Sequence, residues 1–291
     1  MRIFEQESEK PISSLPPVTP GKSFNIDEIP ILGTLTFTPV LIEWKGAVSN
    51  PLYTGKSKSV RHYYNKSSPN RASKDKLSVA LKKVFQQNPD LLTDENLDLP
   101  LGKFILQLKQ NGNPDYKLLV HDHGDEEDYI KFKVKNLTKE RGLYIWVVDN
   151  KPEYIGIASN SNGLENRINK EYGSVTPYKC TIDGQTQTCR SNTKLRDEFK
   201  AKKSISLYVT PIPVESLLSN QEFLQTMNDL GLTKHSPKNV LEVFEKFIIE
   251  KGNFKNGGWN RRMEENFVNR LQELAGIPKK SQILYRIDPS L

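Results

Sequence analysis

Two tyrosines beside glycines are the first residues of this sequence whose types and spacing could support chemistry. They lie in GLYIWVVDNKPEYIGIAS (142–159), which contains the triplets GLY at its start and YIG near its end. The stretch is typical of two apolar strands joined by a polar turn. A phenol held near a reacting group can position a water molecule or accept its proton. The two phenols, Tyr144 and Tyr154, are therefore candidate catalytic groups.

Whether the two tyrosines act together depends on the turn between the strands. Side chains alternate across a strand, so a three-residue loop over 150–152 puts Tyr144 and Tyr154 on the same face. A loop of two or four residues separates them unless the hairpin contains a bulge. Arg167 follows in a short helix that Gly173 is expected to end. Arginine is a natural ligand of phosphate, but two core tyrosines and a surface arginine are the alternative interpretation.

The elements around this hairpin indicate an α+β protein. We predict strands over 31–44, 103–110, 129–137 and 204–214. We predict helices over 74–87, 239–252 and 261–276, each with apolar residues at helical spacing. Residues 45–74 are predicted to form a long loop, and residues 215–240 an irregular segment. Residues 1–30 are rich in proline and are expected to form an extended or partly disordered arm.

Two further clusters offer ligand types for a metal or a disulfide. Cys180 and Cys189 flank TIDGQTQT, which we predict to be a hairpin; its register does not put the thiols opposite each other, so no disulfide is implied. HDHGDEED (121–128) contains His121 and His123 among four acids. These are metal-ligand types, but a block of charges is more often a solvated loop, and we prefer that interpretation.

The charge of the chain favours a polyanionic partner, nucleic acid first. The 291 residues carry a net charge of +7, and no acidic residue lies between Glu43 and Asp75. The basic residues of that interval are Lys45, Lys56, Lys58, Arg61, Lys66, Arg71 and Lys74, with Tyr53, His62, Tyr63 and Tyr64 among them. They form a candidate DNA-binding surface, and a solvated basic loop is the alternative. No apolar run is long enough to span a membrane, and the first residues lack a signal-peptide core, so we expect a cytoplasmic protein.

In order and spacing, these motifs resemble those of the GIY-YIG nucleases. The resemblance extends from the two tyrosine triplets through Arg167, in a helix led by GLEN, to Glu245 and Asn260, and it covers about 140–262. It implies an α+β fold whose core is a small three-stranded antiparallel sheet flanked by helices. In that scheme 139–262 is the catalytic domain, 31–138 is an added N-terminal α/β DNA-recognition region, and 263–291 is a C-terminal helix and tail.

The resemblance also implies a role for each residue of the site. Glu245 would hold a single Mg²⁺ or Mn²⁺ ion per active site, since a hard cation prefers carboxylate oxygen. Arg167 would neutralise charge on the phosphoryl oxygens, and Asn260 would organise the wall of the site. Tyr144 would position the attacking water or accept its proton, and Tyr154 would assist. A free phenol has a pKa of about 10, so Tyr144 would need a nearby cation.

One position departs from the family pattern. Family members commonly carry a histidine or tyrosine one helical turn beyond the arginine, where this chain has Glu171. Tyr172 follows immediately, and we expect it to take this place if the helix ends early. For Glu171 a solvent-facing side chain is the preferred interpretation, and a second glutamate near the metal is the alternative.

The segment GQTQTCRSNTKLRDEF (184–199) resembles the one that follows the catalytic arginine in GIY-YIG restriction endonucleases. That likeness implies DNA contacts from Thr188, Arg190, Asn192 and Lys194; a polar loop and helix cap is the alternative. We therefore expect a Mg²⁺-dependent endonuclease of restriction type that cuts double-stranded DNA. One site per chain and two strands to cut imply a homodimer or tetramer on DNA. A structure-specific or homing-type nuclease, or an inactive DNA-binding protein, remains an alternative.

Overall fold

The computed structural model describes residues 19–29, 32–65, 76–229 and 231–251, and it is a mixed α+β protein. It contains two compact units that are interleaved along the chain. Unit 1 comprises Met1–Leu41, Lys135–Asn166 and Lys203–Leu291, and unit 2 comprises Ile42–Val134 and Arg167–Lys202. These units differ from the consecutive domains expected on either side of residue 138, because strands from both sides of that position join one sheet in unit 1.

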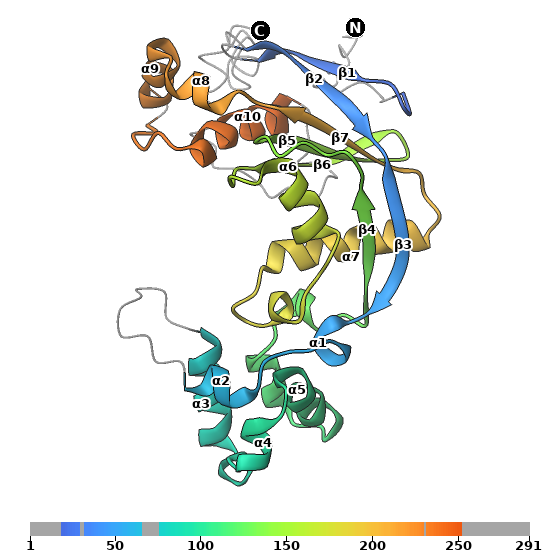
Figure 1. Ribbon diagram of the computed structural model, residues 1–291, viewed down its shortest axis with the longest axis vertical. Coiled ribbons are helices and arrows are strands. Elements are labelled where there is room, and N and C mark those ends of the chain that lie inside the picture. Colours follow the sequence, from blue (N-terminus) through green and yellow to red (C-terminus); the bar gives the residue numbers. More distant parts are fainter. Residues whose placement is uncertain (1–18, 30–31, 66–75, 230, 252–291) are drawn as a thin grey trace, which may run out of the picture. The chain divides into compact units, whose positions relative to one another are not determined.

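Unit 1 contains a five-stranded sheet in the order β1-β2-β7-β5-β6, in which every paired strand is antiparallel (Figure 1). Its strands are β1 (Phe24–Ile29), β2 (Gly33–Val40), β5 (Gly142–Val148), β6 (Lys151–Ala158) and β7 (Ile205–Pro211). β5, β6 and β7 are adjacent in it, but the sheet has five strands and not the three that the resemblance implied. β1 lies inside the predicted arm; that prediction is wrong for 24–29, because Ile26 and Ile29 are buried in the core. Residues 1–18 lie outside the described part of the chain.

Helices cover one face of this sheet. They include α8 (Val214–Leu218), α9 (Gln221–Asp229) and α10 (Pro237–Lys251), and the short α6 (Gly163–Glu165) follows β6. The prediction that 215–240 is irregular is wrong, because Phe223 and Met227, four residues apart, bury one side of α9 in the core. The predicted helix over 239–252 is confirmed as α10, whose apolar face packs against β6.

Unit 2 contains a two-stranded antiparallel sheet and a group of helices. The sheet pairs β3 (Ile42–Ser49) with β4 (Asp128–Val134). The α-helices are α1 (Pro51–Thr54), α2 (Val60–Tyr64), α3 (Lys76–Gln87), α4 (Asp94–Asp98), α5 (Leu101–Gln110) and α7 (Thr186–Lys200). The 3-10 helices are η1 (Pro89–Leu91), η2 (Pro114–Leu118), η3 (Asp122–Gly124) and η5 (Pro177–Cys180), and η4 (Asn166–Tyr172) is a π-helix that begins at the last residue of unit 1.

Three predictions for unit 2 are wrong. The strand predicted over 103–110 belongs to helix α5, whose buried Leu101, Phe104, Ile105 and Leu108 follow helical spacing. The long loop predicted over 45–74 contains the end of β3 and helices α1 and α2. The hairpin predicted between the cysteines is instead the end of η5 and the start of α7.

The helical path brings the two cysteines together. Both are buried and neither is in a disulfide. The Cys189 thiol donates to the carbonyl of Lys179 at 3.5 Å, and its proximity lowers the pKa of Cys180. The hairpin register predicted from the sequence had separated them, and the helix start at Thr186 is the reason for the difference.

Side chains complete the edge of β4 that does not pair with β3. The Asn192 amide accepts from the N–H of Ile130 at 2.8 Å and donates to the C=O of the same residue at 2.8 Å. The Asn169 amide does the same at Val134, with distances of 2.7 and 2.9 Å. Between them, the carbonyl of Gly173 accepts from the N–H of Phe132. Two asparagines and one carbonyl thus replace a third strand and cover an edge that could otherwise pair with another chain.

Candidate functional site

The hairpin of β5 and β6 has a two-residue turn followed by a bulge. Asp149 and Asn150 both have positive φ, as the two central residues of a type I′ turn require. Trp146 pairs with Tyr154 and Val147 with Pro152, which leaves Glu153 as an extra residue on β6. The turn is one residue shorter than the three-residue loop over 150–152 that would by itself put the tyrosines on one face. The bulge restores the parity that the short turn would have lost.

Tyr144 and Tyr154 therefore lie on the same face of the sheet. Tyr144 is opposite Gly156, and Tyr154 is opposite Trp146, two residues further along β5. The centroids of the two tyrosine rings are 6.0 Å apart, with an interplanar angle of 44°. Both side chains are buried. The expectation that the two phenols share a face is confirmed.

The glycine beside each tyrosine has a separate steric reason. A Cβ on Gly156 would be 2.5 Å from Tyr144 Cζ and 2.9 Å from Tyr154 Cε1, and it would clash with the Tyr144 hydroxyl. A Cβ on Gly142 would clash with the carbonyl oxygen of Thr210 on β7. Gly156 thus gives the Tyr144 ring its position, whereas Gly142 allows β5 and β7 to pair closely.

Glu245 lies on α10 among apolar side chains. It follows Leu241 by four residues and precedes Ile248 and Ile249 by three and four, so it shares a helix flank with three buried residues. Its own side chain is partly buried. α10 packs on the face of the sheet opposite to Tyr144 and Tyr154, against the edge strand β6.

Arg167 is held by two neighbours in unit 2. Its guanidinium forms an ion pair with Glu171, and Nη2 donates to the Tyr172 hydroxyl at 3.0 Å. It also lies 4.8 Å from the centroid of the Tyr172 ring. These contacts depend on the π-helical turn η4, in which the N–H of Gly173 donates to the C=O of Ile168, five residues back. One extra residue in the turn brings Tyr172 as well as Glu171 beside the arginine.

The start of this helical segment is fixed by Gly163. Its φ is +49°, and a Cβ there would clash with the carbonyl oxygens of Lys139 and Glu140. The N–H groups of Leu164 and Glu165 donate to the carbonyls of Glu140 and Thr138. The glycine of the GLEN motif therefore allows the first turn of this helical segment to pack directly against the loop before β5.

The structure brings the predicted catalytic residues together in two sets. Tyr144 and Tyr154 share a face in unit 1, which also contains Glu245. Arg167 and Tyr172 are in contact in unit 2. Asn260, the remaining predicted residue, lies outside the described residues.

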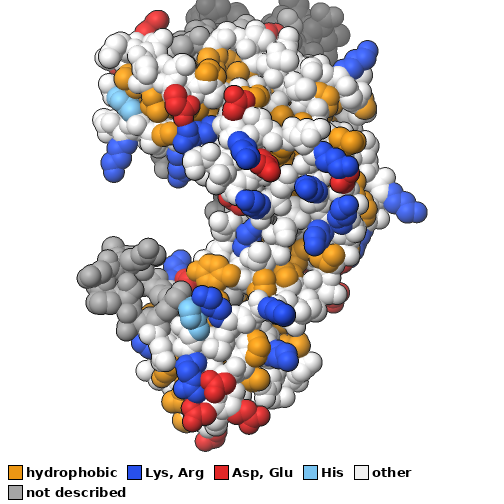
Figure 2. All heavy atoms as spheres, viewed as in Figure 1, with side chains coloured by type: hydrophobic (Ala, Val, Ile, Leu, Met, Phe, Trp, Pro, Cys, Tyr) orange, Lys and Arg blue, Asp and Glu red, His pale blue; other side chains and the backbone are white. Residues whose placement is uncertain are grey.

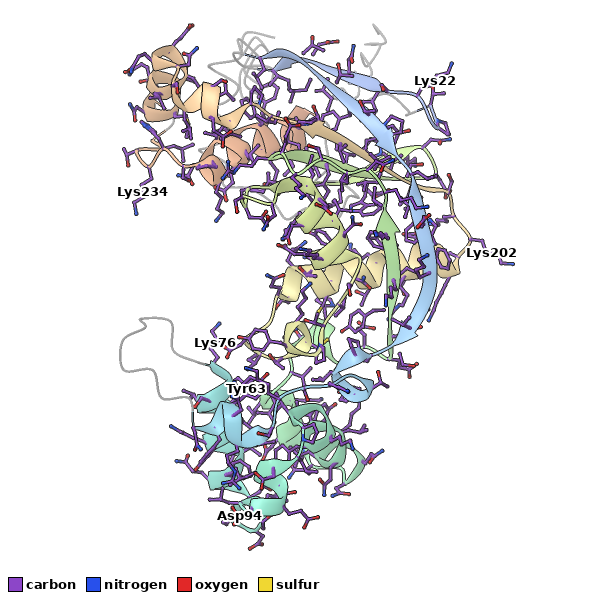
Figure 3. All side chains as sticks on the ribbon, in the orientation of Figure 1. Lys22, Tyr63, Lys76, Asp94, Lys202 and Lys234 are labelled. Atoms are coloured by element: carbon purple, nitrogen blue, oxygen red, sulfur yellow. The ribbon has the colours of Figure 1, made fainter. Side chains whose placement is uncertain are left out.

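The basic interval 45–74 is less free to bind DNA than its sequence suggested. Arg61 bonds to Asp94 and Asp98 of α4, and these bonds raise its pKa. Figure 2 shows acidic side chains grouped at the end of unit 2 where Figure 3 labels Asp94. Lys58 lies 3.2 Å from the His62 ring, and Lys56 is exposed. The other two predicted contacts, Lys66 and Arg71, lie outside the described residues.

The second group of predicted DNA contacts is on α7. Arg190 and Lys194 are partly exposed. Thr188 is buried and donates to the Gln185 side chain. Asn192 is fully buried, and it also donates to the carbonyl of Tyr172 at 2.7 Å. Contact with DNA would break these bonds. Thr188 and Asn192 therefore have structural roles and are not candidate DNA contacts.

Replacing Asn192 with alanine is expected to lower the free energy of unfolding by about 3 kcal/mol. The change leaves the N–H and C=O of Ile130 and the C=O of Tyr172 without their partner, and each buried unsatisfied group is costly. Urea unfolding measures the effect. Asn111→Ala, at an exposed asparagine, is the control and should change stability by less than about 0.5 kcal/mol. Equal effects of the two changes would contradict the structural role.

Side chains of the loop 121–128 form hydrogen bonds with other segments of unit 2. The His121 ring bonds the carbonyl of Lys179 at 2.8 Å, and Asp125 accepts from Lys109, Tyr53 and Tyr116. Within the described ranges, no group of three or more histidine, cysteine, aspartate or glutamate side chains is arranged to hold a metal ion. The solvated loop predicted there is correct only in part, because the segment contains η3 and buries His121, whereas Asp122 and Glu127 are exposed.

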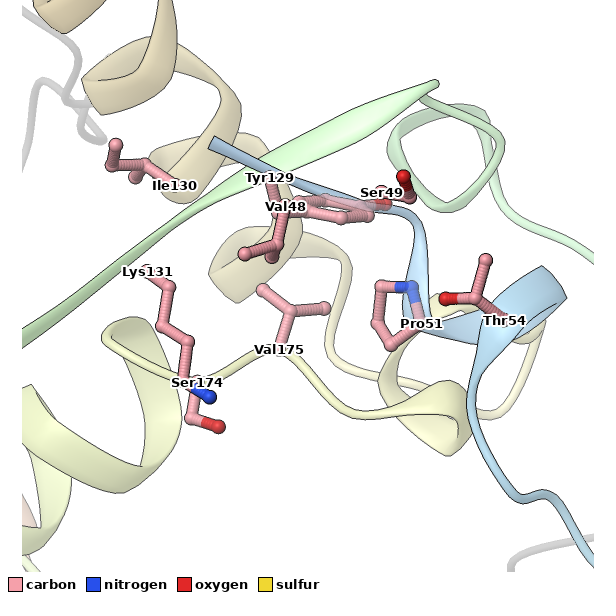
Figure 4. Close-up of a pocket in the computed structure, with 9 residues that line it drawn as sticks. All are labelled: Val48, Ser49, Pro51, Thr54, Tyr129, Ile130, Lys131, Ser174 and Val175. Atoms are coloured by element: carbon pink, nitrogen blue, oxygen red, sulfur yellow. The ribbon is translucent and has the colours of Figure 1, made fainter. Parts of the chain in front are cut away.

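Unit 2 also contains a cavity of about 230 Å³ at the end of β3 (Figure 4). Lys131 and Ser174 lie on one side of it, and Pro51 and Thr54 lie on the other. Its volume is below the roughly 300–1,000 Å³ of small-molecule sites, and we assign no ligand to it.

The described helices and the wider comparisons add two findings. Among the helices that the structure describes, none combines the length and the apolar character needed to cross a membrane. Comparison of the chain with family models, with curated proteins and with solved structures yields no match.

Proposed function

We propose that this protein is a divalent-metal-dependent DNA endonuclease of the GIY-YIG type, which hydrolyses phosphodiester bonds in double-stranded DNA at specific sequences. The observation that carries the proposal is the shared face of Tyr144 and Tyr154, with Gly156 opposite Tyr144 and making room for its ring. The Arg167 cluster, at the expected distance along the chain, is the second support.

In this proposal each side chain has a defined task. Tyr144 orients the attacking water or takes its proton, and Tyr154 limits the positions that the Tyr144 ring can adopt. Arg167 meets the phosphoryl oxygens, where a permanently charged, forked group is most effective. Glu171 and Tyr172 engage two of its five N–H donors and so fix its direction.

The donor set is compatible with one Mg²⁺ or Mn²⁺ ion. Mg²⁺ is commonly held by one or two carboxylates, with waters and substrate phosphate completing its shell, so Glu245 alone can be the protein ligand. When bound, the ion would stabilise charge on the leaving oxygen. Glu245 must then reach past β6 toward the tyrosine face. β6 is an edge strand of the described sheet, so no further strand of that sheet separates α10 from that face.

The partner in this proposal is duplex DNA, and the acting form is a homodimer or tetramer, because each chain offers one site for two strands. Among the described residues, the candidates for phosphate contacts are Lys56, Lys58, Arg190 and Lys194. Each phosphate contact releases counterions, so binding should weaken steeply with salt.

Cleavage of a mixed DNA library with sequencing of the ends tests the proposal. We expect cuts at one short sequence in Mg²⁺ or Mn²⁺ and none in EDTA. Glu245→Gln should abolish cutting, whereas Glu242→Gln, one turn earlier on α10, should cut like the parent protein. Absence of cutting in every DNA tested, or parental cutting by Glu245→Gln, would contradict the proposal.

The same experiment separates the alternatives. Cuts only at branched junctions would identify a structure-specific nuclease. Tight binding of DNA without any cutting in Mg²⁺ or Mn²⁺ would identify an inactive DNA-binding protein. A single protein chain per cleaved duplex would contradict the oligomer.

A further inference from the structure

The end of the π-helical turn η4 is closed by a lysine from another segment. The ammonium of Lys179, in η5, donates to the carbonyl oxygens of Lys170 at 2.7 Å, Glu171 at 2.9 Å and Ser174 at 3.3 Å. An ammonium has three N–H donors, and Lys179 uses one for each carbonyl. These acceptors belong to the last residues of the turn and to the chain that leaves it.

These contacts satisfy carbonyl groups that would otherwise lack hydrogen-bond partners at the end of the turn. The last carbonyls of a helix have no partner within it, and the C-terminal end carries partial negative charge. A positive charge there supplies both donors and charge. Lys179 is partly buried; desolvation lowers the pKa of its ammonium, and the Glu171 carboxylate opposes that change.

A second side chain acts at the next carbonyl. Asn192 donates to the C=O of Tyr172 while it is fixed to Ile130 of β4. The carbonyls of 170, 171, 172 and 174 are thus bound by side chains from outside the turn. π-helices are rare because an ordinary α-turn is more stable. Hydrogen bonds from outside the turn can offset this difference in stability.

We propose that Lys179 is a positioning residue for Arg167: it holds the turn in the π form, which keeps both Glu171 and Tyr172 against the guanidinium. This inference rests on the nuclease function proposed above only for its effect on catalysis. If the ammonium is removed, the turn loses three hydrogen bonds and can tighten to the α form. Tyr172, five residues beyond Arg167, then rotates away, and Glu171, four residues beyond it, stays.

The test compares Lys179→Met with two matched variants. Lys179→Arg keeps the charge and the donors, and Lys170→Met removes an exposed positive charge from the same turn. The first readout does not depend on activity: the Nε–H signal of Arg167 in a ¹⁵N NMR spectrum, assigned by its loss in Arg167→Lys. We expect Lys179→Met to shift or broaden this signal, and both controls to retain it.

The second readout is DNA cleavage in Mg²⁺. Displacement of a catalytic group by about 1 Å can cost on the order of 10²-fold in rate, so we expect Lys179→Met to lower kcat by that factor. KM should stay unchanged, and Lys179→Arg should recover most of the rate. If Lys179→Met does not fold, Lys179→Gln, which retains one amide donor group, replaces it with the same expectations.

The outcomes distinguish this inference from the nuclease proposal. A parental Arg167 signal in folded Lys179→Met would overturn the positioning role, whatever the protein cuts. A changed signal in a protein that cuts no DNA would support the positioning role and overturn the nuclease. Equal losses of kcat in Lys179→Met and Lys170→Met would assign the effect to charge alone and overturn the role of the carbonyl contacts.

Discussion

Replacing Arg167 with methionine is expected to lower the rate of DNA cleavage by about 10³-fold, because an arginine on a transferring phosphoryl group contributes roughly 10³–10⁵ in rate. Methionine keeps much of the side-chain volume and removes the charge. The partners of Arg167 show why a fork is needed: one Nη nitrogen meets Glu171 and the other meets Tyr172. Single-turnover cleavage, with protein in excess over DNA, measures the chemical step without product release.

Two further variants sharpen this prediction. Arg167→Lys restores the charge without the fork and should recover less than about a tenth of the lost rate, because a point charge cannot meet two partners and a phosphate in one plane. Arg190→Met, in the same unit, removes a partly exposed arginine that we assign to DNA binding. It should weaken binding and reduce the salt dependence by about one counterion, with the cleavage step intact. Parental cleavage by Arg167→Met would remove the arginine from the mechanism.

Local patterns predicted the elements around this site well where one face is apolar. β7, α3 and α10 each carry an apolar repeat that matches their period, and β5 is a continuous apolar run buried on both faces; each is present. The segment now seen as α5 was misassigned because KFILQLKQ satisfies a strand pattern at several positions, while Leu101, at the first turn, completes the helical one. Whether such a short apolar run forms a helix or a strand depends on the residues that bury it.

The sequence alone does not predict the features that depend on contacts between distant parts of the chain. The sequence permits an odd loop or a bulge between Tyr144 and Tyr154, and the bulge at Glu153 is set by pairing with β5. The sequence does not decide between Glu171 and Tyr172, because the carbonyls of the π-turn are bound by Lys179 and Asn192 from elsewhere in the chain. Asn192 looked like a DNA contact for the same reason, since its partners on β4 lie 62 positions away.

Replacing Gly156 with alanine is expected to cost about 2 kcal/mol of stability and to lower cleavage on the order of 10²-fold, although it adds one methyl group. The new Cβ would lie 2.5 Å from Tyr144 Cζ and nearer to the hydroxyl, so the ring must leave its position. The backbone of Gly156 does not have a positive φ, so the cost comes from the collision and not from backbone strain. Urea unfolding and single-turnover cleavage measure the two effects.

A double-mutant cycle with Tyr144→Leu identifies the collision partner. Leucine lacks both atoms that the new Cβ would meet on residue 144, so Gly156→Ala in that background should cost less than about 0.5 kcal/mol, which gives a coupling energy of roughly 1.5 kcal/mol. The remaining contact, with Tyr154 Cε1 at 2.9 Å, accounts for the residual cost. Equal costs in both backgrounds would show that Gly156 serves the backbone and not the phenol. The YIG glycine would then lose its link to the position of the Tyr144 ring.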